Sequence, residues 1–122
     1  MTSRFSQHGP LARGALAVAV LVSLAVLFAP ASDVPSSPPG VDKVVHLSLF
    51  LALGLTARWA GVGRQVTAIT LLLYAVVSEL LQGTDLVGRD AELLDGVADA
   101  LGVLVALVIW QLVSRPRGDS LR

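Results

Sequence analysis

The sequence predicts an all-α fold, a polytopic membrane protein built as an antiparallel bundle of four transmembrane helices. Hydrophobic residues make up 54% of the 122 residues and charged residues only 15%, with a mean hydropathy of +0.74. Soluble domains usually have about 45–50% apolar and about 25% charged residues. The apolar residues are gathered into four blocks, each near the ~17–25 residues that a helix needs to cross a bilayer. A helix also satisfies its own backbone polar groups in lipid.

The four expected spans cover residues 12–29, 44–60, 65–83 and 93–113. They form one transmembrane domain, residues 12–113, between an N-terminal segment (1–11) and a basic tail (114–122). The first block has an alternative interpretation as a cleaved signal peptide. Arg4 and Arg13 precede its apolar part, and the segment "APA" that follows resembles an A-x-A cleavage site. We favour a retained helix.

The distribution of charge predicts the orientation of the spans. Basic residues are enriched in cytoplasmic loops, and seven of the nine lie on one side of the predicted membrane, namely Arg4, Arg13, Arg58, Arg64, Arg115, Arg117 and Arg122. Every acidic residue except Asp119 falls in the opposite half. We therefore expect both termini in the cytoplasm and the protein in the cytoplasmic membrane of a bacterium.

The lengths of the apolar runs place ionisable residues inside the membrane. Residues 66–78 would provide about 20 Å of helix, which is too short to cross, so Glu79 must lie within or at the edge of the apolar layer. Residues 100–113 are similarly short, which brings Asp99 and Asp95 into the layer. Charged groups at this depth normally face the interior of a bundle or a wet cavity.

These groups belong to a set of polar residues that we expect at the outer ends of three spans. Asp42 and His46, and Asp95 and Asp99, are spaced i,i+4, so each pair shares one helix face. The sequence therefore predicts an outward-facing, acid-rich pocket. Its candidate residues are Asp42, Lys43, His46, Glu79, Gln82, Arg89, Asp95 and Asp99.

Purely structural roles are the alternative for several of these residues. Asp42 and Lys43 could be a helix N-cap and a lysine that extends its amine to the interface. Glu79 could pair with Arg89 only to hold the second outer loop. Asp99, two turns inside its span, is the hardest to explain in this way.

Small residues on the fourth span suggest close helix packing without any chemistry. Ala98 and Gly102, and likewise Gly96 and Ala100, have the small-xxx-small spacing that allows two helices to approach closely.

Three segments, "DKVVHLSLF", "SELLQ" and "GRDAELLDGVADALG", together resemble the VanZ-like family of small bacterial membrane proteins. The family pattern falls on Asp42, Lys43, His46, Glu79, Gln82, Arg89, Asp95, Asp99 and Gly102. The resemblance covers roughly residues 42–104, and the first span fits by position only. It implies a role in the cell envelope, since the family's namesake is associated with low-level resistance to the glycopeptide teicoplanin. It implies no particular reaction.

Three functions are compatible with these features. The first is an envelope protein whose pocket binds a lipid or peptidoglycan-precursor headgroup and thereby alters sensitivity to glycopeptide antibiotics. The second is a membrane enzyme acting on a lipid-linked substrate, with Glu79 or Asp99 as general base, His46 as acid or metal ligand, and Arg89 on a phosphate. The third, an ion or proton pathway, is disfavoured because the inner halves of the spans are almost unbroken apolar sequence.

Composition limits cofactors and partners. No cysteine is present, which excludes disulfides and thiolate metal sites, and the formal net charge is zero, so there is no electrostatic case for nucleic acid. No cofactor motif is evident. One histidine among several carboxylates is compatible with a hard divalent cation.

Overall fold

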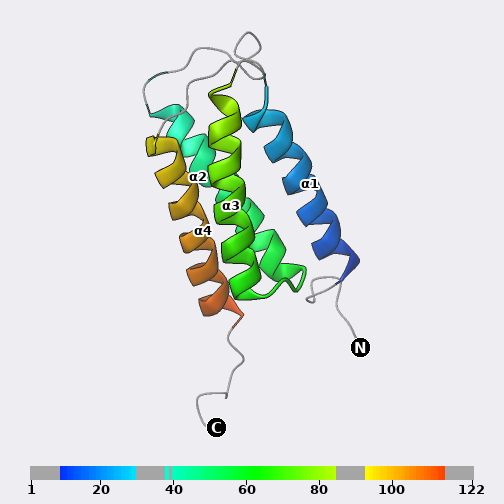
Figure 1. Ribbon diagram of the computed structural model, residues 1–122. Helices are drawn as coiled ribbons and strands as arrows, with labels where there is room; N and C mark the ends of the chain where they lie inside the picture. The colour runs from blue at the N-terminus through cyan, green and yellow to red at the C-terminus, as the bar shows by residue number, and fades with distance from the viewer. Residues whose placement is uncertain (1–8, 30–37, 39, 85–92, 115–122) are drawn as a thin grey trace.

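The computed structural model describes residues 9–29, 38, 40–84 and 93–114 of the chain. In these ranges the protein is all-α, with four helices: α1 (Pro10–Leu27), α2 (Val41–Trp59), α3 (Arg64–Gln82) and α4 (Leu93–Val113). The helices run alternately up and down along the bundle (Figure 1). Their bounds lie within three residues of the predicted spans, and those of α4 coincide with the prediction.

Three of the helices, α1, α3 and α4, are long and apolar enough to cross a membrane. These helices indicate a membrane protein, as the composition predicted. The remaining helix, α2, has a similar length but carries three charged residues, Asp42, Lys43 and Arg58. A fourth crossing by α2 therefore stays a prediction. Residues 1–8 of the N-terminal segment, most of the first outer loop, residues 85–92 with Arg89, and residues 115–122 of the basic tail lie outside the described residues.

Helix α2 is central to the bundle, since it packs against α1, α3 and α4. Its closest approach is to α4 and depends on glycine. A Cβ atom added to Gly102 would clash with the backbone oxygen of Leu47, and one added to Gly54 would lie 2.5 Å from Cβ of Ala106. Close approach through small residues is a common way for helices to associate in lipid. The predicted packing role of Ala98 and Gly102 is consistent with this contact, since both are buried.

The second predicted small-residue pair behaves differently. A Cβ atom added to Gly96 would meet no atom within 4 Å, so no close helix contact requires glycine there. Gly96 and Ala100 instead line a groove between α3 and α4. The prediction that this pair packs closely against another helix was wrong for Gly96, because it lies on the α3 side of α4, away from the close contact with α2.

The turn between α2 and α3 reverses the chain in four residues. Gly61 adopts a positive φ of 96°. Its N–H donates to the carbonyl of Arg58 (3.0 Å), and the N–H of Val62 donates to the carbonyl of Ala57 (2.9 Å). This pattern is a Schellman motif, in which glycine provides the left-handed residue that ends a helix. It places α3 directly beside α2.

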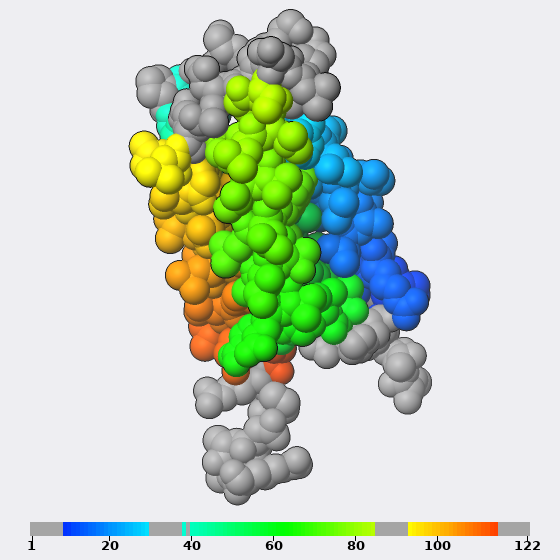
Figure 2. Space-filling view, in the orientation of Figure 1, coloured from blue at the N-terminus to red at the C-terminus, as the bar shows by residue number. Residues whose placement is uncertain are grey.

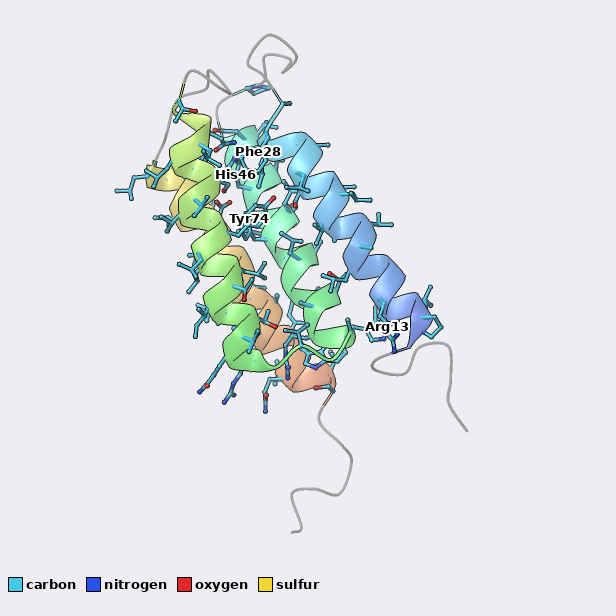
Figure 3. The ribbon with its side chains drawn as sticks, turned by 45° about the vertical axis from the view of Figure 1, so that its right-hand side comes forward. Arg13, Phe28, His46 and Tyr74 are labelled. Carbon is cyan, nitrogen blue, oxygen red and sulfur yellow. The ribbon has the colours of Figure 1, made fainter. Side chains whose placement is uncertain are left out.

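Helix α1 is tied to α3 by polar contacts near one end. The Ser23 hydroxyl and the Tyr74 hydroxyl are 2.9 Å apart, and the Gln82 amide donates to the carbonyl of Leu27 (2.8 Å). The Tyr74 ring also packs between Phe28 and Phe50, with centroid distances of 6.4 and 5.5 Å. Figure 3 shows Phe28, His46 and Tyr74 at the same end of the bundle, with Arg13 at the opposite end of α1. We call the end near His46 the cluster end.

Candidate functional site

A histidine and an aspartate meet in the interior of the bundle at the cluster end. His46 on α2 is 2% exposed and Asp99 on α4 is fully buried. Their side chains are joined by a hydrogen bond of 2.8 Å, which Nδ1–H of His46 donates to Oδ1 of Asp99. A carboxylate on one ring nitrogen fixes the orientation of the imidazole and with it the direction of the other nitrogen, Nε2, which has no hydrogen-bond partner among the described residues.

A second aspartate connects this pair to the bundle surface. Oδ2 of Asp95 lies 3.6 Å from Nε2 of His46, and Oδ1 of Asp95 lies 3.0 Å from Nζ of Lys43. Lys43 also pairs with the half-exposed Asp42 at 2.9 Å, and this hydrogen bond lowers the pKa of Asp42 below its usual value. Ionisable groups thus form a continuous line from Asp42 at the start of α2 to Asp99 in the interior.

Glu79 is the residue that α3 contributes to this site. It is 9% exposed, and one carboxylate oxygen of Glu79 lies within 4.8 Å of ligand atoms of both His46 and Asp99. Three helices therefore contribute to one site. We call His46, Glu79, Asp95 and Asp99 the polar cluster.

Three members of the polar cluster, His46, Glu79 and Asp99, could together hold a metal ion. One nitrogen and two carboxylate oxygens suit a divalent cation such as Mg²⁺, Mn²⁺ or Zn²⁺. Oδ2 of the fully buried Asp99 has no hydrogen-bond partner among the described residues. A buried carboxylate oxygen in this state is a suitable ligand for a cation, because leaving it unsatisfied is costly.

The charge of the site is predominantly negative in the part of the chain that the structure describes. Four carboxylates, those of Asp42, Glu79, Asp95 and Asp99, gather around one lysine and one histidine. Charges buried in an apolar bundle are unfavourable unless they are paired. The arrangement is therefore suited to a positively charged group, to hydrogen-bond donors or to proton transfer at His46.

The structure brings together most of the predicted site residues. Glu79 has His46 and Asp99 as neighbours, as the sequence predicted. Gln82 has a different role, since its amide nitrogen bonds to the end of α1 and no described hydrogen bond connects it to the polar cluster. The predicted position of Arg89 beside Glu79 lies outside the described residues.

Sequence reasoning missed two contacts of this region. The pair between Lys43 and Asp95 joins helices that are not consecutive, so spacing along one helix gave no sign of it. Ser23, which pairs with Tyr74, looked like an isolated polar residue in the most apolar stretch of α1. The sequence does not indicate which face of α1 is turned toward α3. The burial of Ser23 could therefore not be predicted.

Comparisons with family models, with curated proteins and with solved structures find no match to this chain. The fold and the site therefore define only a class. The protein is an all-α membrane protein with a buried histidine–carboxylate cluster shared by three helices at one end of its bundle.

Proposed function

We propose that this chain is a VanZ-like protein of the bacterial cell envelope that binds the headgroup of a lipid or lipid-linked wall precursor at its polar cluster. Binding would alter the sensitivity of the cell to glycopeptide antibiotics such as teicoplanin. The observation that carries the proposal is the gathering of His46, Glu79 and Asp99 from three helices into a single buried site. An otherwise apolar bundle has no structural need for so many ionisable groups, which are costly in lipid and usually mark a functional site.

The proposed setting is the cytoplasmic membrane, with both termini in the cytoplasm and α2 as a fourth crossing. Seven of the nine basic residues and eight of the nine acidic residues of the sequence fall at opposite ends of the predicted spans. The polar cluster then lies near the outer surface, where lipid headgroups and wall precursors are found.

A deletion strain of the source bacterium tests the proposal. We expect deletion to change teicoplanin sensitivity several-fold and the wild-type gene to restore it. His46→Ala and Asp99→Asn should fail to restore it even when their membrane abundance equals that of the wild type. Ser48→Ala is a matched control, because Ser48 is an exposed residue on α2 that bonds only to the carbonyl of Val44. Unchanged sensitivity in the deletion strain, or losses that follow protein abundance in every variant, would contradict the proposal.

A metal-assisted membrane enzyme is the second candidate, and the observation that favours it is the set of ligand atoms that His46, Glu79 and Asp99 place within 4.8 Å of one another. Bound there, a divalent cation would polarise a phosphoryl or carbonyl oxygen of a lipid-linked substrate. His46 is held by Asp99 and could transfer a proton. Purified protein incubated with labelled lipid-linked precursors and Mg²⁺, Mn²⁺ or Zn²⁺ should then convert them, and unaltered precursors in all three would rule out this activity.

A further inference from the structure

A groove of about 400 Å³ lies between α3 and α4 and has one member of the polar cluster, Glu79, in its lining. Its large lining side chains, such as Leu72, Leu80 and Leu93, are exposed, while its smallest members, Ala75, Gly96 and Ala100, are buried or partly buried. The small residues thus form the floor and the large ones the sides. Figure 2 shows α3 and α4 side by side on this face of the molecule.

Gly96 gives the groove its depth. A glycine inside a helix costs about 1 kcal/mol relative to alanine. At Gly54 and Gly102 the close approach of α2 and α4 explains this cost, but a Cβ atom at Gly96 would meet nothing within 4 Å. No neighbouring helix requires a glycine at position 96. The missing side chain instead leaves open space in the groove between α3 and α4.

Glu79 connects the groove with the polar cluster. Among the described residues that line this groove it is the only ionisable one, and its carboxylate also lies near His46 and Asp99. A molecule in the groove would therefore have its apolar part against Leu72 and Val76 and its polar part against Glu79. This is the arrangement that an amphiphile requires.

We propose that the groove between α3 and α4 holds an acyl chain of a bilayer lipid whose ammonium headgroup binds at Glu79. The inference rests on the proposed function and narrows its ligand to an aminolipid that enters sideways from the membrane.

Two observations determine this occupant. Helices α3 and α4 are both long and apolar enough to span a membrane, so the groove between them opens toward hydrocarbon chains. The carboxylate of Glu79 lies in its lining, and the polar cluster to which Glu79 belongs holds three carboxylates and one histidine among the described residues. Charge complementarity therefore favours a cationic amine over an anionic headgroup.

The experiment uses the full chain in bilayers that contain equal amounts of phosphatidylethanolamine and phosphatidylglycerol. One of the two lipids at a time carries a photoactivatable acyl chain, and mass spectrometry locates the labelled peptides. We expect several-fold more labelling of α3 and α4 by the phosphatidylethanolamine probe than by the phosphatidylglycerol probe. Gly96→Leu should reduce this labelling several-fold, because the added side chain fills the groove.

Gly14→Leu is the matched control. Gly14 lies in α1, has no atom within 4 Å of an added Cβ, and lines a separate groove of about 660 Å³ between α1 and α2. None of the described residues that line that groove is ionisable, so this variant should leave the labelling of α3 and α4 unchanged. Glu79→Gln should keep the labelling but abolish the preference for phosphatidylethanolamine.

Equal labelling of α3 and α4 by the two probes in the wild-type protein would overturn the inference, and this measurement does not depend on any variant. Labelling that is unaffected by Gly96→Leu would also overturn it, as would a cross-link through the groove to a second copy of the chain. In these cases the proposed function survives if polar-cluster variants still change teicoplanin sensitivity. Conversely, selective labelling without any drug phenotype would support the lipid site and contradict the proposed role in resistance.

Discussion

His46 is an ionisable side chain that is held inside the bundle between two carboxylates. It is almost fully buried, and its two ring nitrogens lie near the carboxylates of Asp99 and Asp95 on another helix. An imidazole between two acids can carry a proton or, with Nδ1 bound to Asp99, offer Nε2 to a ligand. The residue therefore contributes both to packing of α2 on α4 and to any chemistry of the site.

We predict that His46→Ala destabilises the protein by about 3–5 kcal/mol, because it leaves two buried carboxylates without their shared partner. Thermal or denaturant unfolding of the purified protein in detergent would measure the loss. Asp42→Asn serves as the control and should cost less than about 1 kcal/mol, since its pair with Lys43 is half-exposed. Equal losses in the two variants would show that burial does not determine the cost.

A second residue-scale prediction concerns Gln82. Gln82→Leu removes the donor to the buried carbonyl of Leu27 and should cost about 1–3 kcal/mol. Thr84→Val removes a comparable bond to the carbonyl of Leu81 on the exposed end of α3, so it should change the free energy of unfolding by less than about 0.5 kcal/mol. The same unfolding assay applies. A harmless Gln82→Leu would mean that the bond does not hold α1 to α3.

At the scale of helices, the two sides of α4 differ in how closely they are packed. One side presents Ala98, Gly102 and Ala106 to α2, and all three are buried. The other side presents Gly96 and Ala100 to the groove beside α3. Helix α4 is thus rigidly held on α2 and leaves space next to α3.

This asymmetry predicts opposite effects of the same substitution at two glycines of α4. Gly102→Ala should lower the free energy of unfolding by about 1–3 kcal/mol, because the added methyl group would force α2 and α4 apart. Gly96→Ala should be stabilising by about 0.5–1 kcal/mol, because the new Cβ meets no atom and the helix propensity improves. Unfolding midpoints of the two variants, measured together, would reveal the difference in sign.

The helices themselves could be predicted from the sequence because block length and apolar content are local properties. Helix α4 was predicted with both ends correct, and the proximity of Glu79 to His46 and Asp99 followed from their common depth. The orientation of the helices about their axes could be predicted where ionisable residues mark the inner face, but not along their apolar parts, because in lipid the apolar residues do not distinguish one face from another. For this reason Gly96 was placed in a helix contact and the link from Lys43 to Asp95 was missed.

At the scale of the whole molecule, the open question is whether α2 crosses the membrane as the three more apolar helices can. Helix α2 carries Asp42, Lys43 and Arg58 near its ends, and its neighbours cover its buried face. Pro38 and Gly63 lie at its two ends and are both exposed. If α2 spans the membrane, these positions face opposite compartments.

Single-cysteine labelling would determine this topology, since the chain contains no cysteine of its own. We predict that Pro38→Cys and Thr84→Cys react with a membrane-impermeant maleimide in intact cells. Gly63→Cys should react only after the membrane is opened. Reaction of Pro38→Cys and Gly63→Cys from the same side would show that α2 does not cross, and reaction of Gly63→Cys alone in intact cells would reverse the predicted orientation.

The bond between His46 and Asp99 joins residues 53 positions apart in the chain, which has a consequence for biosynthesis. During translation α2 leaves the ribosome long before α4, so His46 enters the insertion machinery without Asp95 and Asp99, and Lys43 enters with Asp42 but without Asp95. Helix α2 carries three charged residues, more than any of the other three helices, and is expected to wait at the protein-conducting channel, or to remain weakly inserted, until α4 arrives. Membrane integration of the two helices should therefore be coupled, and a nascent chain stopped after α3 should be a preferred target of membrane proteases.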